Sequence, residues 1–178
     1  MGSYTQAHVQ AARFMSALNG KELWTCRRAA DMATFQFGAR TTTKDYYGRP
    51  SEVGEYALHV QCAWRFVRDD QIVVGSSDLY YPAQSGDQTQ DEIPANFDWD
   101  RHPNRRDRLL EALFKPGSVE LVVQRIELGA AGSLHIGLSE GLSLEVFPDN
   151  SLPDEHWRLL TPASNGQHLV VAGRGISF

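Results

Sequence analysis

Hydrophobic and polar side chains alternate most regularly between Glu55 and Pro82. In the first part of this stretch every second residue is apolar, which is the period of a β-strand with one buried face. The apolar members are Leu58, Val60, Cys62, Trp64 and Phe66. A second run, residues 71–81, is rich in Ile, Val and Tyr, and the polar residues 68–71 separate the two runs. The pattern therefore predicts two strands in an antiparallel hairpin.

The amino-terminal part of the chain predicts one helix and one strand. Residues 4–18 carry apolar side chains among helix-favouring Ala, Gln and Met, and Asn19-Gly20 is typical of a helix end. Residues 32–37 alternate apolar side chains with Thr and Gln, which indicates a strand. Residues 21–30 fit either a strand or a loop, and residues 39–54 have no period and are expected to form a loop.

The remainder predicts a second helix followed by strands. Residues 104–114 begin with the capping residue Asn104 and carry a stripe of Leu and Phe, and Pro116-Gly117 ends the helix. Apolar runs predict strands at residues 119–128, 134–138, 142–147, 157–160 and 168–172. The short loop 139–141 ends in Gly, so the strands on either side are expected to be antiparallel neighbours.

These elements predict a fold of the α+β class. Two helices and about eight strands, mostly joined by hairpins, favour one strongly curved antiparallel sheet, and an approach to a barrel is one form that such a sheet takes. The length of 178 residues fits a single domain, residues 1–178. With 42% hydrophobic and 22% charged residues, the composition is typical of a protein with a packed core.

Charge and cysteine content exclude several function classes. The net charge of -5 argues against a nucleic-acid partner, because such partners require a concentrated basic surface. Cys26 and Cys62 lie in no zinc or redox spacing, so no metal and no cofactor are predicted. No apolar run approaches the ~20 residues that span a bilayer, and the amino terminus lacks a secretory signal. We therefore expect a cytoplasmic protein without a membrane partner.

The polar face of the predicted central strand carries His59, Gln61 and Arg65. If this face lines a cavity, an imidazole, an amide and a guanidinium suit a carboxylate or phosphate ligand. If it does not, these side chains form the wet side of an antiparallel sheet. His135 and Glu145 lie on the polar sides of two later strands and are candidates to join the same site. No metal-ligand spacing is present among them.

The longest irregular stretch, residues 83–104, contains Phe97 and Trp99. Long loops inside compact domains are often functional, and aromatic side chains are enriched at binding hot spots. The alternative is a solvated insertion whose two aromatic residues cover an edge of the core. Phe97 and Trp99 are therefore candidate interface residues.

Three segments carry a family resemblance: GEYALHVQCAWRF, LEVFPDNSLPDEHWRLL and HLVVAG. They resemble small uncharacterised bacterial proteins, some of which are grouped with immunity proteins of polymorphic toxin systems. This resemblance implies a cytosolic bacterial protein with a binding role, and it carries no catalytic residue over.

The sequence contains no GxSxG elbow and no complete phosphate-binding loop. We therefore expect a non-enzymatic interaction protein that binds a basic protein partner. The alternative is a small-ligand-binding or hydrolytic barrel-like protein with its site on the face of His59, Gln61 and Arg65. Self-association as a homodimer through a sheet edge is a third hypothesis.

Overall fold

The structure is a computed structural model that describes residues 5–45, 47–84, 93–163, 166 and 168–178. It is an α+β fold with two α-helices, α1 (Gln6–Met15) and α2 (Arg105–Leu113), and two 3-10 helices, η1 (Ser16–Leu18) and η2 (Ser76–Tyr80). The strands are β1 (Glu22–Ala29), β2 (Met32–Phe37), β3 (Thr41–Lys44), β4 (Pro50–Val53), β5 (Tyr56–Val60), β6 (Ala63–Arg68), β7 (Gln71–Gly75), β8 (Leu121–Leu128), β9 (Leu134–Leu138), β10 (Leu142–Phe147), β11 (Glu155–Leu160), β12 (Leu169–Ala172) and β13 (Gly175–Ser177).

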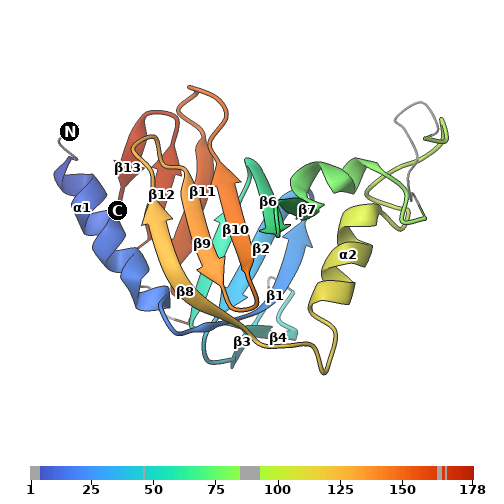
Figure 1. Ribbon diagram of the computed structural model, residues 1–178, viewed down its shortest axis with the longest axis horizontal. Coiled ribbons are helices and arrows are strands. Elements are labelled where there is room, and N and C mark those ends of the chain that lie inside the picture. Colours follow the sequence, from blue (N-terminus) through green and yellow to red (C-terminus); the bar gives the residue numbers. More distant parts are fainter. Residues whose placement is uncertain (1–4, 46, 85–92, 164–165, 167) are drawn as a thin grey trace.

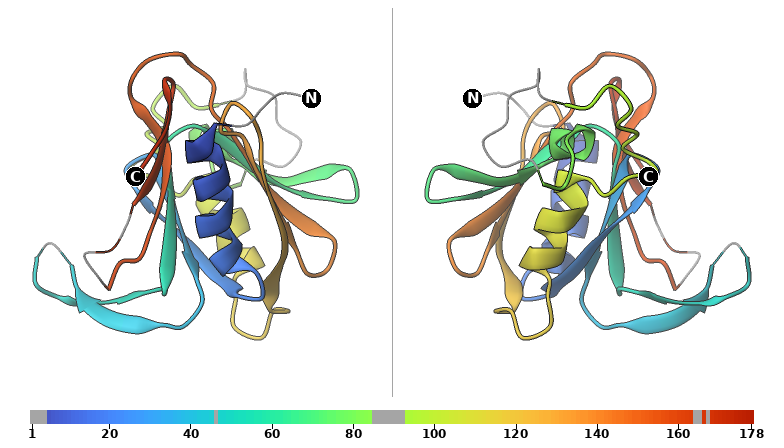
Figure 2. Two further views of the ribbon diagram at one scale, coloured as in Figure 1. Left: turned by 90° about the vertical axis from the view of Figure 1, so that its left-hand side faces the viewer. Right: turned by 90° about the vertical axis from the view of Figure 1, so that its right-hand side faces the viewer.

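Eleven of these strands form one antiparallel sheet in the order β13-β12-β11-β5-β2-β1-β8-β9-β10-β6-β7. The expectation of an antiparallel sheet is confirmed, but the sheet is not closed into a barrel, because β13 and β7 are its two edges. β1 and β8 pair through only two residues each, so the sheet folds there into two walls. We call them the β1 wall (β1, β2, β5, β11–β13) and the β8 wall (β6–β10); they diverge on either side of the helices (Figure 2).

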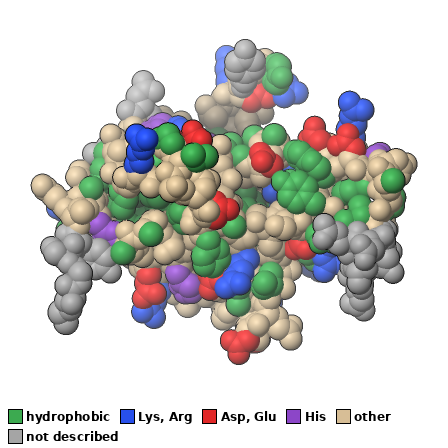
Figure 3. Space-filling view, turned by 90° about the horizontal axis from the view of Figure 1, so that it is seen from above, with side chains coloured by type: hydrophobic (Ala, Val, Ile, Leu, Met, Phe, Trp, Pro, Cys, Tyr) green, Lys and Arg blue, Asp and Glu red, His purple; other side chains and the backbone are tan. Residues whose placement is uncertain are grey.

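The hydrophobic core lies between the two walls. Phe35 of β2 contacts Trp64 and Phe66 of β6 edge-to-face, with ring centroids 5.2 and 5.9 Å apart. All three side chains are buried. On the face seen from above, hydrophobic side chains show between charged side chains of both signs (Figure 3). The period of two in the sequence arises because each wall buries one face of its strands against the other wall.

The predicted strand across residues 58–66 is wrong in its continuity. β5 ends at Val60 and pairs with β2 and β11 in the β1 wall, whereas β6 begins at Ala63 and pairs with β10 and β7 in the β8 wall. The chain crosses between the walls at Gln61-Cys62. The five apolar residues of this stretch are nevertheless all buried, because both strands turn the same alternating set toward one core.

The hairpin of β6 and β7 is confirmed. The two strands are antiparallel, and the turn residues Asp69 and Asp70 both have left-handed backbones with φ of 48° and 62°. Asp tolerates this conformation, which matches the twist of the strands in two-residue hairpins. β7 ends at Gly75 and the chain continues as η2, so the second strand is shorter than predicted.

The structure contains more strands than the eight expected. Residues 21–30 form β1, and the predicted loop 39–54 contains the separate hairpin of β3 and β4. β3 is rich in Thr and largely exposed, so no apolar alternation marks it. Within the described residues, no helix has the length and apolar character needed to cross a membrane.

The two helices occupy equivalent positions at opposite ends of the space between the walls (Figures 1 and 2). α1 begins after the capping residue Thr5 and contacts β13 and β8, so it bridges the outer edge of one wall and the first strand of the other. α2 begins after Asn104, whose side chain accepts a hydrogen bond from the backbone of Asp107. It contacts β7 and η2 and lies beside β1.

Candidate functional site

One edge of β1 is open. β1 pairs with β2 from Leu23 to Ala29, but it pairs with β8 only at Glu22 and Leu23. In the part of the chain that the structure describes, no other strand pairs with residues 24–29 on that second edge. Alternate residues of an antiparallel strand direct their N–H and C=O groups away from the partner. This edge therefore offers backbone hydrogen-bonding groups to an added strand.

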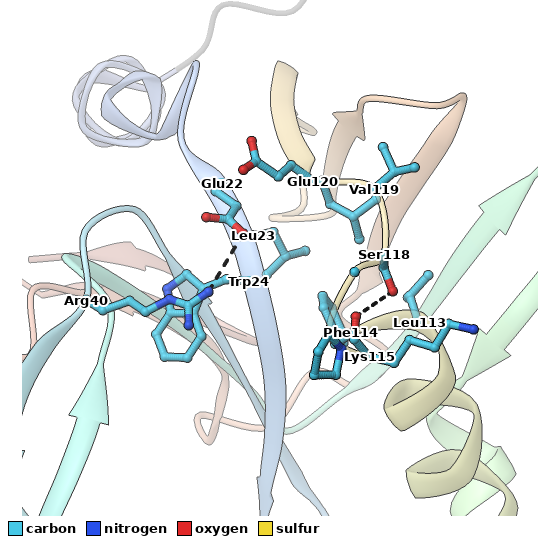
Figure 4. Close-up of a pocket in the computed structure, with 13 residues that line it drawn as sticks. Glu22, Leu23, Trp24, Arg40, Leu113, Phe114, Lys115, Ser118, Val119 and Glu120 are labelled. Atoms are coloured by element: carbon cyan, nitrogen blue, oxygen red, sulfur yellow. Dashed lines mark hydrogen bonds and ion pairs between the residues drawn. The ribbon is translucent and has the colours of Figure 1, made fainter.

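A groove follows the open edge. Two cavities of about 410 and 390 Å³ lie between β1 and the segment that runs from α2 to the start of β8. Residues 114–116 line both cavities, which therefore adjoin, and we call them together the β1 groove. Figure 4 shows its first part, where Leu23 of β1 and Val119 lie on opposite sides of the opening.

The floor of the β1 groove is apolar. Leu23 and Leu110 line it and are buried members of the hydrophobic core. Phe114 also lines it and contacts Phe66 of β6 edge-to-face, with ring centroids 6.3 Å apart. At the rim, Val119 is 62% exposed. The groove thus combines these apolar side chains with charged ones, such as Glu22 and Arg40 in its first part, beside the open edge of β1.

A β-bulge at Trp24 coincides with the point where β1 and β8 separate. The register between β1 and β2 shifts after Leu23, so that the adjacent residues Leu23 and Trp24 are both buried. The Arg40 guanidinium lies 4.6 Å from the centroid of the Trp24 ring (Figure 4). The Arg27 guanidinium lies 5.7 Å from the same centroid. A bulge bends its strand and interrupts the hydrogen-bond ladder. The bulge therefore turns the rest of β1 away from β8 and opens the edge.

Ion pairs tie the start of α2 to β1 at the other end of the groove. Arg28 Nε donates to Asp107 Oδ2 at 2.9 Å, and Arg28 Nη1 donates to Asp100 Oδ1 at 3.0 Å. The hydrogen bond to Asp100, followed by the charge of Asp107, raises the pKa of Arg28. Arg28 thus stays charged and fixes the distance between the strand and the helix.

Neither cysteine is an activated nucleophile. Cys26 is half-buried and lines the β1 groove, and desolvation of its thiol raises the pKa well above the usual range. Burial, assisted by the charge of Asp149, raises the pKa of Cys62 to about 12. Both thiols are therefore protonated near neutral pH, whereas nucleophilic cysteines have lowered pKa values.

His59, Gln61 and Arg65 do not meet in one cavity. His59 lies on the outer face of the β1 wall, opposite Arg158 of β11. Burial first, and then the charge of Arg158, lower the pKa of His59. Gln61 lies in the crossing between the walls, where its Nε2 donates to Glu155 Oε1 at 3.3 Å. Arg65 lies on the β8 wall, so the predicted face is divided between the walls.

Arg65, His135 and Glu145 lie in one row across the outer face of the β8 wall. Glu145 of β10 is opposite both Arg65 of β6 and His135 of β9. Arg65 Nε donates to Glu145 Oε2 at 2.6 Å, and its guanidinium lies 5.1 Å from the ring centroid of Phe147. His135 and Glu145 border a cavity of about 230 Å³. The carboxylate is already paired with Arg65, which leaves little for a ligand to gain from it.

Phe97 and Trp99 are half-buried and lie outside the β1 groove. Phe97 stacks on His102 with ring centroids 6.0 Å apart, and Trp99 contacts Tyr80 of η2 edge-to-face at 5.9 Å. These contacts fit a segment that covers η2 and the start of α2. Much of the long loop, residues 85–92, lies outside the described residues.

No group of three His, Cys, Asp or Glu side chains in the described part of the chain is placed to hold a metal ion. Comparisons with family models, with curated proteins and with solved structures found no match for this chain. The geometry of the site is therefore the basis for a functional proposal.

The β1 groove was not predicted from the sequence. Its strand lies in residues 21–30, where the adjacent apolar residues Leu23 and Trp24 break the period of two. That break is the local signal of a bulge, but it does not reveal that β8 leaves β1 at this point. The groove arises from segments about ninety positions apart and depends on tertiary structure.

Proposed function

We propose that this protein is a non-enzymatic binding protein that takes up an extended segment of a protein partner along β1. The observation that carries the proposal is the open edge of β1 beside an apolar groove. Addition of a strand to an exposed sheet edge is a recurrent mode of peptide recognition, in which main-chain hydrogen bonds supply affinity and side-chain pockets supply specificity.

The groove defines the chemistry of the partner segment. Side chains of an added strand point alternately to its two faces. One set would reach the floor formed by Leu23, Leu110 and Phe114, so the segment carries apolar residues at every second position. The net charge of -5 favours a basic partner through electrostatic steering of the encounter. A role like that of immunity proteins, which the resemblance implies, requires this kind of binding and no catalysis.

A screen of extended peptides tests the proposal. A phage-displayed library is selected on the purified chain, and hydrogen exchange of the complex with a selected peptide is followed by NMR. We expect slower exchange at amides of residues 24–29 that face away from β2, because an added strand bonds to them. Protection confined to residues 93–104, which contain Phe97 and Trp99, would contradict the proposal and favour the loop as the interface.

Two exposed apolar residues provide a matched pair of variants. Val119 is 62% exposed at the rim of the groove, and Ile72 is 60% exposed on β7. Val119→Glu places a charge beside the apolar floor and is expected to weaken peptide binding at least tenfold, about 1.4 kcal/mol. Ile72→Glu should leave the affinity unchanged. Equal affinities of the two variants for the peptide would remove the groove from consideration.

Self-association is the competing use of the same edge. Two copies could pair their β1 strands across a two-fold axis, which would bury the open edge without a partner. Light scattering on the purified chain distinguishes the cases. We expect a monomer in the absence of peptide. A stable dimer that Val119→Glu dissociates would instead mean that the open edge of β1 binds a second copy of this chain.

A further inference from the structure

Arg106 of α2 is a buried charged residue with unused hydrogen-bonding capacity. It is 1% exposed, and its Nη1 donates to the backbone oxygen of Asp31 at 3.0 Å. Its Nε and Nη2 atoms are buried and have no hydrogen-bond partner among the residues that the structure describes. The Asp107 carboxylate is 3.8 Å from Nε, too far for a hydrogen bond. A buried donor without a partner is costly, so this arrangement calls for an explanation.

The two unpaired nitrogens are a matched pair. Nε and Nη2 lie on the same edge of the planar guanidinium group, and their N–H bonds on that edge are parallel. This edge fits the two oxygens of a carboxylate in a bidentate pair, which is the strongest class of hydrogen-bonded contact for arginine. The unused edge of Arg106 is therefore specific for a planar group with two oxygens.

Arg106 lines a cavity that is separate from the β1 groove. The cavity has a volume of about 190 Å³ and shares no lining residue with the two cavities of the groove. The cavity is lined by Tyr80 of η2, by Trp64 of β6, and by Gln61 and Cys62 of the crossing between the two β walls. This volume is below the ~300–1,000 Å³ typical of sites for drug-sized ligands, so an occupant has few heavy atoms.

Two carboxylates exclude a simple anion from the cavity. Asp31 and Asp149 line it together with Arg106. Both are exposed, and the Asp149 carboxylate lies 3.9 Å from His156 Nδ1. Sulfate or phosphate would meet two negative charges for one positive charge, which opposes binding. An ammonium group, in contrast, would be attracted to either carboxylate.

We propose that this cavity binds a small molecule that carries both a carboxylate and an amine, such as a free amino acid. Nε and Nη2 of Arg106 have almost no accessible surface in the structure, so the carboxylate reaches this edge as the side chains around the cavity move to admit it, and the ammonium group lies toward Asp31 and Asp149. Tyr80 and Trp64 contact the atoms between the two charged groups. The site completes the hydrogen bonding of Arg106 and matches the mixed charge of the lining.

Isothermal titration calorimetry with a ladder of ligands tests this proposal. Glycine, β-alanine and γ-aminobutyrate separate the same two charged groups by increasing distances, and the standard L-amino acids extend the set. We expect at least one of them to bind with a Kd at or below about 1 mM. Acetate, methylammonium and sulfate should each bind at least tenfold more weakly. Equal binding of acetate or sulfate, or no saturable binding by any amino acid, would overturn the proposal.

Variants of the exposed acids test the placement without disturbing the core. Asp31→Asn and Asp149→Asn should each weaken the best ligand at least fivefold, and Asp154→Asn, an exposed acid outside the cavity, should leave it unchanged. Arg106→Lys keeps the charge but loses the bidentate edge and should also weaken binding. Val119→Glu should not affect this ligand, so failure of the peptide proposal is measured separately. Unchanged affinity in both acid variants would contradict the zwitterion assignment.

Discussion

The two helices bridge the walls in equivalent ways, but they differ in what lies beside them. Next to α1 the strand edge between the walls is hydrogen-bonded, whereas next to α2 the edge of β1 is open. On the side of α1, the edge of β8 next to β1 is occupied by the chain itself: Gly20 N donates to Val123 O at 2.8 Å, and Val123 N donates to Lys21 O at 2.9 Å. On the side of α2, the edge of β1 faces the β1 groove. The binding site that we propose thus lies on the α2 side, where the strand edge between the walls is left without a partner strand among the described residues.

Residue size and charge at the helix interfaces explain the difference. α1 presents Ala11 and Met15 to the core, both with 0% exposure, and these side chains permit close packing. α2 presents Leu110 and Arg106, of which Arg106 is both larger and charged, and it is anchored at its start by the ion pairs of Arg28. Bulky and charged anchors keep α2 at a distance from β1. The space between α2 and β1 extends from Asp107 in the first turn of the helix to Phe114 after its last turn.

Truncation of one core-facing residue on each helix should give the largest difference between the α1 side and the α2 side. The quantity compared is the loss in free energy of unfolding. Met15→Ala creates a cavity at a fully buried position and is expected to lower the free energy of unfolding by about 2–5 kcal/mol. Leu113→Ala, at a half-buried position beside the groove, should lower it by about 1 kcal/mol. Urea unfolding followed by tryptophan fluorescence measures both changes. Equal losses would mean that α2 packs as tightly as α1.

Removal of the anchor of α2 should have a smaller effect. Arg28→Ala breaks the contacts with Asp100 and Asp107, which are partly exposed, and should cost about 1 kcal/mol. Arg101→Ala is the control, because Arg101 is largely exposed and its only recorded ion pair in the described residues is with Asp98 at 3.5 Å. The same urea titration compares them. If the two variants are equally stable, the ion pairs of Arg28 do not hold α2 in place.

The sequence predicts the closed parts of this molecule better than the open ones. The strands β9 and β10, with the bounds 134–138 and 142–147, appear as predicted, because each alternates between a buried and an exposed face. Both α-helices also appear, each begun by a capping residue. The crossing at Gln61-Cys62 was missed, because the alternation continues through it. Local periodicity reports burial and is silent on which wall a residue joins.

The candidate residues show the same limit. His59 and Arg65 are separated by an even number of positions. This spacing predicts a common face only if both residues belong to one continuous strand. The crossing places them on different walls. Arg106, in contrast, occurs among several charged residues of a predicted helix, and nothing in the sequence distinguishes it from Arg105 or Arg108. Its burial and its unpaired nitrogens come from η2 and the turn at Asp31, which approach it only in the folded chain.

The smallest expected effect is a change in how often α2 opens locally. Alkylation rates of the two cysteines measure it. Cys26 lies in the β1 groove beside α2, and Cys62 lies in the crossing between the walls. Alkylation requires the thiolate, and burial raises the pKa of both thiols. Reaction of native protein with iodoacetamide at pH 7 should therefore be far slower than that of a free cysteine. Because the pKa of Cys62 is about 12, direct reaction there should still increase at pH 9 rather than level off.

A comparison of the two cysteines in Arg28→Ala isolates the α2 side. Release of the anchor exposes Cys26 more often, so its labelling rate, measured by mass spectrometry of peptides, should increase severalfold. The rate at Cys62 should change little, because the crossing between the walls does not depend on the contact of Arg28 with Asp107. A parallel increase at both cysteines would mean that the whole chain unfolds and that α2 has no opening of its own. A selective increase of the labelling rate at Cys26 would establish that α2 opens away from β1 while the rest of the chain stays folded. Entry of an added strand requires such an opening.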